Sequence, residues 1–175
     1  MPTTDPLNVV IVCGNPKINS RTLGVAQGIA RAVATAVGRD DNVRTHIVDL
    51  GNLGGALFDF TSDAVKAEVA AVAAADVAII ASPTYKATYT GMLKSFLDWF
   101  GQTGMANVVA VPVMVGGSVI HALAPEVSLR PLLVEVGAVV PTRGLFILDS
   151  ELEQLDATVA TWLETAGPTL RRLLA

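Results

Sequence analysis

The stretch Val77-Ala78-Ile79-Ile80-Ala81-Ser82-Pro83-Thr84-Tyr85 joins the most apolar short run of the chain to a polar loop. A short run of Val, Ile and Ala that ends at turn-forming residues is typical of a strand buried on both faces of a parallel sheet. A helix is predicted next, over Gly91–Phe100, because Met92, Phe96 and Trp99 recur at helical spacing. A strand, a loop and a helix in this order form one unit of an α/β fold.

The same unit recurs five times along the chain. Strands are predicted at Asn8–Val12, Arg44–Leu50, Val77–Ala81, Val108–Val115 and Ala138–Leu148. Helices are predicted at Leu23–Val37, from Ser62 to Ala75, and at Gly91–Phe100, Val119–Val136 and Glu151–Leu174. Alternating strands and helices predict right-handed crossovers and a parallel sheet with helices on both faces. We therefore expect one flavodoxin-like domain over residues 1–175, a three-layer sandwich with the strand order 2-1-3-4-5.

Prolines mark the two weakest of these predicted elements. Pro125 and Pro131 disturb the helix expected at Val119–Val136. Pro141 predicts an edge position or a break in the fifth strand, because proline cannot donate to a sheet ladder. The last helix is either continuous or broken near Gly167-Pro168.

The composition and charge pattern favour a globular protein over a disordered, nucleic-acid-binding or membrane protein. The 175 residues are 51% hydrophobic and 16% charged, with a net charge of -4, which excludes a disordered chain and argues against a nucleic-acid binder. No charged residue lies between Asp98 and Glu126, but Pro112 and Gly116–Ser118 interrupt this stretch, so it is not a membrane span. The start, Met1–Leu7, lacks the cationic region of a secretory signal. We expect a cytoplasmic protein without a membrane partner.

Cysteine and histidine usage argues against redox and metal chemistry at protein side chains. Cys13 is the only cysteine, closes an apolar strand and is expected to be a buried core residue. The two histidines, His46 and His121, have no cysteine or carboxylate at ligand spacing, so no metal site is expected.

Three loops are expected at the ligand-binding edge of this sheet, since doubly wound sheets bind ligands at the carboxyl ends of their strands. The first loop, Gly14–Thr22, opens a helix and contains Lys17 and Arg21, a composition that suits a phosphate monoester. It lacks the glycine spacing of dinucleotide folds and of nucleoside-triphosphate loops. A plain helix cap after a turn explains the same residues without a ligand.

The other two loops offer contacts to a planar ring. Ser82–Gly91 contains both tyrosines of the chain, and its backbone amides can bond the edge of a heterocycle, although such tyrosines also pack in subunit interfaces. Gly116-Gly117-Ser118 permits close approach of a ring or of another backbone, and is equally common as an ordinary turn. A phosphate loop and two ring-edge contacts at one edge of a sheet favour flavin mononucleotide (FMN).

Two motifs resemble a known family. Ser82–Lys86 with Tyr89-Thr90-Gly91 and Leu93–Asp98 resembles the NADPH-dependent FMN reductase family. Gly116–Leu123 with Leu129–Leu133 resembles its branch that supplies reduced FMN to sulfonate-type two-component monooxygenases, and Gly144–Asp149 fits as the last strand.

The resemblance implies a site, a reaction and partners. It assigns the FMN phosphate to the first loop and the isoalloxazine ring to the other two, with His121 nearby. With Asn19 of the first loop included, the candidate cofactor-binding residues are Asn15, Lys17, Asn19, Ser20, Arg21, Thr22, Pro83, Thr84, Tyr85, Lys86, Gly116, Gly117, Ser118 and His121. Hydride is expected to pass from NADPH or NADH to flavin N5, so no catalytic side chain is assigned. The backbone amides of Gly117 and Ser118, together with the start of the following helix, are expected to stabilise the reduced flavin. A homodimer or homotetramer is implied.

The chain departs from the family pattern at two places. Asn15 stands where serine is commoner, which keeps the loop polar. Val127 stands where sulfonate-type members can have an aromatic residue, in a helix used for subunit contacts and flavin exchange.

Two alternative functions remain: a quinone, azo, nitro or metal-oxyanion reductase with tightly bound FMN, and a non-enzymatic flavodoxin-like electron carrier. The sequence leaves open the acceptor, the preferred nucleotide, flavin retention and oligomer size.

Overall fold

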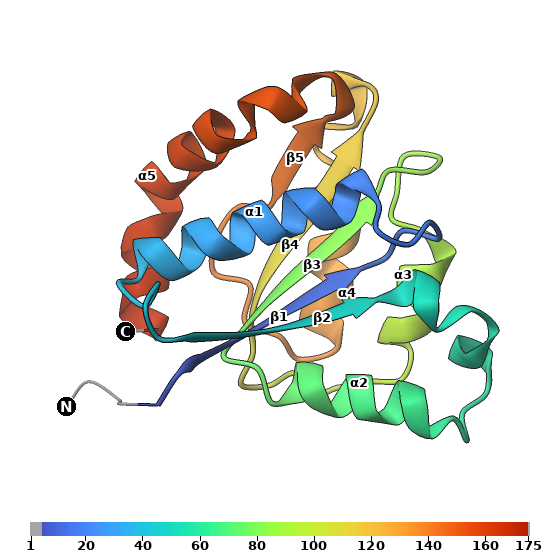
Figure 1. The fold of residues 1–175 in the computed structure, drawn as a ribbon. Coiled ribbons are helices and arrows are strands. Elements are labelled where there is room, and N and C mark those ends of the chain that lie inside the picture. Colours follow the sequence, from blue (N-terminus) through green and yellow to red (C-terminus); the bar gives the residue numbers. More distant parts are fainter. Residues whose placement is uncertain (1–4, 175) are drawn as a thin grey trace.

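The sheet has five parallel strands in the order β2-β1-β3-β4-β5, as predicted. The computed structural model describes residues 5–174, and Figure 1 shows the twisted sheet running through the middle of the molecule. The strands are β1 Leu7–Cys13, β2 Val43–Asp49, β3 Val77–Pro83, β4 Val109–Gly116 and β5 Leu145–Leu148. The strand order reverses between β1 and β3, which are hydrogen-bonded neighbours, so the switch point of the sheet lies there.

Helices cover both faces of the sheet and form two apolar cores. One core lies under α1 (Arg21–Ala36) and α5 (Leu155–Leu174), which run together over one face in Figure 1. The other lies under α2 (Asp63–Ala73), α3 (Gly91–Leu97) and α4 (Arg130–Glu135). The flavodoxin-like sandwich expected from the sequence is therefore present.

The buried strands explain the hydropathy of the chain. Every residue of β3 and of β4 is buried, because each strand has a neighbour on both sides and helices above and below. The edge strand β2 has residues 43–47 exposed, which matches its mixed polar sequence. Among residues 5–174, no helix is both long and apolar enough to cross a bilayer.

The helix predicted at Val119–Val136 is wrong as one element. The segment contains a short 3₁₀ turn at Val119–His121 (η3), a π-turn at Pro125–Leu129 (η4) and the short helix α4. Pro125 begins the π-turn, since a residue without an N–H group fits the start of a helical turn and not its interior. Pro131 lies in the first turn of α4 and does not break it, for the same reason.

The fifth strand is broken where Pro141 predicted it. Val139 forms an isolated bridge with Val109, and the regular strand β5 resumes only at Leu145, on the edge of the sheet. The last helix, α5, continues through Pro168, and a 3₁₀ turn at Asp149–Gln154 (η5) precedes it. A single domain over residues 1–175 stays a prediction. Residues 1–4, part of the segment expected not to be a secretory signal, lie outside the described residues.

Candidate functional site

The loops after β1 and β3 meet at the carboxyl edge of the sheet. Thr90, the N-cap of α3, donates a hydrogen bond from its hydroxyl to the Gly14 carbonyl at 2.6 Å. Its own N–H donates to the buried Ser82 hydroxyl at 3.0 Å. The first bond joins two loops at positions 76 residues apart, and the second closes the loop after β3 on itself. Ser82 and Thr90 belong to the family motif but were not among the predicted site residues.

A pocket of about 360 Å³ lies where these loops meet. We call it the carboxyl-edge pocket. Its lining residues are Asn15, Lys17, Asn19, Ser20, Arg21, Thr22, Pro83, Tyr85, Val115 and Asp149. All six candidates from the first loop thus lie in one pocket with two from the second. Thr84, Lys86, Gly116, Gly117, Ser118 and His121 are not in its lining.

Hydrogen bonds within the first loop shape one wall of this pocket. Ser20 is the N-cap of α1 and accepts from the Leu23 N–H at 3.3 Å. The Asn15 side chain donates to the Thr22 hydroxyl at 3.1 Å and accepts from the Lys17 N–H at 2.9 Å. The first N–H groups of a helix have no partner within the helix, and the first turn of α1 has no acidic residue. The start of α1 therefore offers donors and positive potential to an anion.

The end of β2 supports the first loop from beneath. Asp49 is buried, and one of its carboxylate oxygens accepts from the Asn19 N–H at 2.9 Å. Asn19 has a φ of 51°, a left-handed conformation that asparagine tolerates. Gly51 lies so close to the loop that a Cβ atom there would be 3.0 Å from the Pro16 carbonyl oxygen and 3.2 Å from the Ile18 nitrogen. Neither Asp49 nor Gly51 was predicted, because nothing near them in the sequence marks a contact with residues 16–19.

The tip of the second loop is a tight hairpin with unusual residues. Tyr85 and Thr88 exchange two backbone hydrogen bonds, of 2.9 and 3.2 Å, across Lys86 and Ala87. Both central residues have positive φ, 53° and 67°, where such turns prefer Asn and Gly. Strain of this kind persists where the surroundings impose it, often at functional sites. The hairpin leaves the Tyr85 ring 53% exposed at the rim of the pocket.

Thr84 has a buried hydroxyl oxygen with no hydrogen-bond partner among the described residues. Its N–H donates to the Val115 carbonyl at 2.7 Å, so its position between β3 and β4 is fixed by the backbone. Buried hydroxyls are nearly always paired in a complete structure. The orphan oxygen fits a ligand with a polar ring edge, such as the isoalloxazine of FMN.

The two glycines of the third loop, Gly116 and Gly117, differ in the space around them. A Cβ on Gly116 would be 2.7 Å from the Phe146 ring and 3.1 Å from the Thr84 hydroxyl, so protein side chains use the space that this glycine leaves. Around Gly117, no atom lies within 4 Å of a Cβ position, and the backbone is open to a ligand.

The helix start expected after Ser118 is absent. Only the three-residue η3 follows, and His121, half-buried, is its last residue. Three residues do not supply the dipole that was expected to stabilise a reduced flavin. The backbone amides of the loop are the remaining donors on this side.

Cys13 is fully buried beneath the first loop, as expected. Burial raises the pKa of its thiol and outweighs the opposing hydrogen bonds with the Ser20 side chain and the Asn15 backbone. The nearby Asp49 carboxylate adds a smaller rise to this pKa. The thiol is therefore a core group. Within residues 5–174, no three His, Cys, Asp or Glu side chains gather as a metal site would require.

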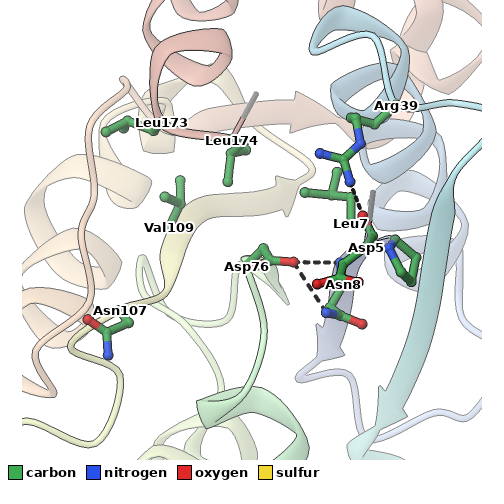
Figure 2. Close-up of a pocket in the computed structure, with 10 residues that line it drawn as sticks. Asp5, Leu7, Asn8, Arg39, Asp76, Asn107, Val109, Leu173 and Leu174 are labelled. Carbon is green, nitrogen blue, oxygen red and sulfur yellow. Dashed lines mark hydrogen bonds between the residues drawn. The ribbon is translucent and has the colours of Figure 1, made fainter. Parts of the chain in front are cut away.

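A second pocket, of about 370 Å³, lies at the opposite edge of the sheet (Figure 2). There the Asp76 carboxylate accepts hydrogen bonds from the Asn8 backbone at 2.8 Å and from the Asn8 side chain at 3.3 Å. Arg39 donates to the Asp5 carbonyl. These bonds join the amino ends of β1 and β3 to the segment after α1, and none of the predicted site residues lines this pocket.

Comparison with known proteins decides the family. The chain matches the NADPH-dependent FMN reductase family over residues 7–153. It belongs to this family. A curated relative, the NADH-dependent FMN reductase SfnE of Pseudomonas putida, is 30% identical over 152 residues, which cover 84% of this chain and 80% of the relative. The FMN reductase (NADPH) of Escherichia coli strain K12 is 34% identical over 121 residues, 66% of this chain and 63% of that one.

A solved structure agrees with the family assignment. The apo form of the NADH:FMN oxidoreductase EMOB superposes with a TM-score of 0.80 at 32% identity, covering 97% of this chain and 90% of that one. As an FMN reductase, the protein is an NAD(P)H:FMN oxidoreductase that uses FMN and a nicotinamide nucleotide. Flavin chemistry fits a site without a catalytic triad, because the flavin and the nicotinamide supply the reacting atoms.

Proposed function

We propose that this FMN reductase binds FMN across the carboxyl-edge pocket, with the phosphate at the start of α1. The observation that supports it best is the composition of that pocket, which combines Lys17, Arg21 and the first turn of a 16-residue helix with Pro83 and Tyr85 of the second loop. A phosphate monoester matches the first set, and a planar ring matches the second.

Each group of residues has one task in this proposal. Lys17, Arg21 and the first N–H groups of α1 hold the phosphate. The Thr84 hydroxyl and the amides of Gly117 and Ser118 hydrogen-bond the polar edge of the ring, and Tyr85 covers it from the rim. The flavin supplies the chemistry, which is acceptance of a hydride from NADPH or NADH.

We further propose that reduced FMN leaves the enzyme for a two-component monooxygenase in the cytoplasm. The motifs Gly116–Leu123 and Leu129–Leu133 resemble the branch with that role. The high exposure of Arg21, 70%, also favours exchange, because a ligand held by exposed cations is only partly removed from water.

Self-association is proposed for the segment after β4. Five large apolar side chains in it are more than half exposed: Val119, Ile120, Leu123, Val127 and Val134. Contiguous exposed apolar surface marks interaction sites in soluble proteins. A homodimer or homotetramer that covers this segment accounts for it.

Anaerobic stopped-flow reduction tests the proposed reaction. The enzyme is mixed with NADH or NADPH, with and without added FMN, and nucleotide oxidation is compared with that in the presence of a quinone. Multiple turnovers with free FMN are expected. Turnover with quinone and none with added FMN would contradict the proposal and favour a reductase that retains its flavin. No bleaching of bound FMN by either nucleotide would contradict any reductase activity.

A further inference from the structure

Asp149 enters the carboxyl-edge pocket from a part of the chain that the predicted site did not include. It follows β5 directly and begins η5, and it lines the pocket together with residues of the first loop. Its carboxylate Oδ1 lies 3.5 Å from Nη2 of Arg21, the first residue of α1. A carboxylate thus pairs with one of the two cations that a phosphate would use.

The Arg21–Asp149 pair is weak and therefore easily exchanged. The two side chains are 70% and 38% exposed, and exposed ion pairs contribute little because water screens them. A phosphate is a stronger partner for a guanidinium, since it has about two charges near neutral pH and accepts two parallel hydrogen bonds. A phosphate at the start of α1 would draw Arg21 away from Asp149.

We propose that Asp149 is a specificity-determining residue that competes with the flavin 5′-phosphate for Arg21. The inference rests on the proposed phosphate position at the start of α1. In the free enzyme Arg21 is held by Asp149, and flavin binding exchanges this pair for Arg21–phosphate. The exchange lowers the affinity for FMN specifically through its phosphate, which keeps the flavin releasable.

Asp49, the buried acid near the first loop, has a different role. Asp49 accepts from the Asn19 N–H at 2.9 Å, and it does not line the pocket. Asp49 therefore positions the backbone of the loop, whereas Asp149 acts on a side chain inside the pocket. Of these two acids, only Asp149 pairs with Arg21, so only removal of its charge would free that cation for the flavin phosphate.

Flavin titrations of Asp149→Asn test this proposal. Dissociation constants for FMN and for riboflavin, which lacks the phosphate, are measured by quenching of flavin fluorescence. Asp149→Asn is expected to bind FMN about two- to fivefold more tightly, with riboflavin binding unchanged. In an Arg21→Gln background the same substitution is expected to give no gain. Asp40→Asn, on the exposed turn between α1 and β2, is the control with the same change of net charge.

The outcomes separate this inference from the proposed function. Weaker FMN binding by Asp149→Asn would overturn it, because Asp149 would then orient Arg21 toward the phosphate. An equal gain in the Arg21→Gln background would also overturn it, since Asp149 would act by direct repulsion. If the wild-type protein bound riboflavin as tightly as FMN, the phosphate site itself would fail. A melting temperature near that of wild type shows that each variant is folded.

Discussion

Close contacts at glycine decide the shape of the first loop. Gly51 lies in the 3₁₀ turn Leu50–Asn52 that follows β2, and the atoms that a Cβ would meet include backbone atoms of residues 16 and 18. Backbone atoms cannot move aside as a flexible side chain can, so any larger residue at position 51 displaces the loop. Gly55, in the same irregular segment, has no atom within 4 Å of its Cβ position.

Gly51→Ala is therefore expected to weaken FMN binding about tenfold, or about 1.4 kcal/mol. Riboflavin binding should change less, because we propose that the displaced loop contacts the phosphate and not the ring. Fluorescence titration with both flavins measures the difference, and Gly55→Ala is the matched control. Equal losses for the two flavins would contradict the phosphate assignment of this loop.

At the scale of single residues, sequence reasoning found what lies within one loop. Four residues that line the pocket were recognisable because their loop joins one strand to one helix: Lys17, Ser20, Arg21 and Thr22. Asp49 and Asp149 were not, because they lie at the end of β2 and directly after β5. Asp49 reaches the first loop, and Asp149 reaches the pocket, only through the strand order.

The π-turn η4 is fastened by one carboxylate. Glu126 accepts from Nε of Arg130 at 2.7 Å and from the Gly144 N–H at 2.5 Å. Arg130 also donates to the Val140 and Thr142 carbonyls. These bonds attach the turn after Ala124 to the segment that leads into β5. The half-buried Glu126–Arg130 pair thus takes the place of regular backbone hydrogen bonds in this part of the chain.

The pKa of Glu126 predicts how this link responds to pH. Burial opposes its charged form, but the hydrogen bonds from Arg130 and Gly144 and the charges of Arg130 and Arg143 outweigh burial, so its pKa is lowered. A carboxyl whose pKa is lowered on folding stabilises the protein at pH values above its pKa in the unfolded chain, about 4.3. This stabilisation is lost as the pH falls through the pKa of the folded state.

Glu126→Gln is accordingly expected to lower the free energy of unfolding by about 1–2 kcal/mol at pH 7. The difference from wild type should shrink as the pH falls below about 4.3 and through the lowered pKa of the folded carboxyl, where that carboxyl becomes protonated. Urea unfolding at both pH values measures it, with Glu164→Gln, on the exposed face of α5, as control. A difference that is constant with pH would show that the charge of Glu126 does not stabilise the fold.

At the scale of elements, buried strands were predicted well and proline-containing segments poorly. β1, β3 and β4 agree with their apolar runs to within one or two residues. The segment from Val119 to Val136 was wrong as one helix, because its regular hydrogen bonds are replaced by side-chain bonds to residues 140–144 that no local pattern announces.

For the whole molecule, the exposed apolar segment after β4 predicts self-association. A solution mass above the 18.2 kDa of one chain is expected. Replacing Ile120 and Leu123, which are 80% and 57% exposed, with Asp should shift the protein toward the monomer, because charges are costly to bury in an apolar interface. Light scattering coupled to size exclusion measures this.

Leu173→Asp is the control for that experiment, since Leu173 is 49% exposed at the other edge of the molecule, near the end of α5. It should leave the mass unchanged. A wild-type mass of one chain would contradict self-association through this segment.

The sequence alone determined the fold and the family motifs, because alternating apolar runs and turn residues act over short distances along the chain. Only the tertiary structure decided which distant residues complete the pocket. Asp49, Gly51 and Asp149 reach the first loop because β2 pairs with β1 and β5 ends at the same edge of the sheet. Sheet pairing brings together residues more than a hundred positions apart, and that proximity is a property of the packed strands, not of any local sequence.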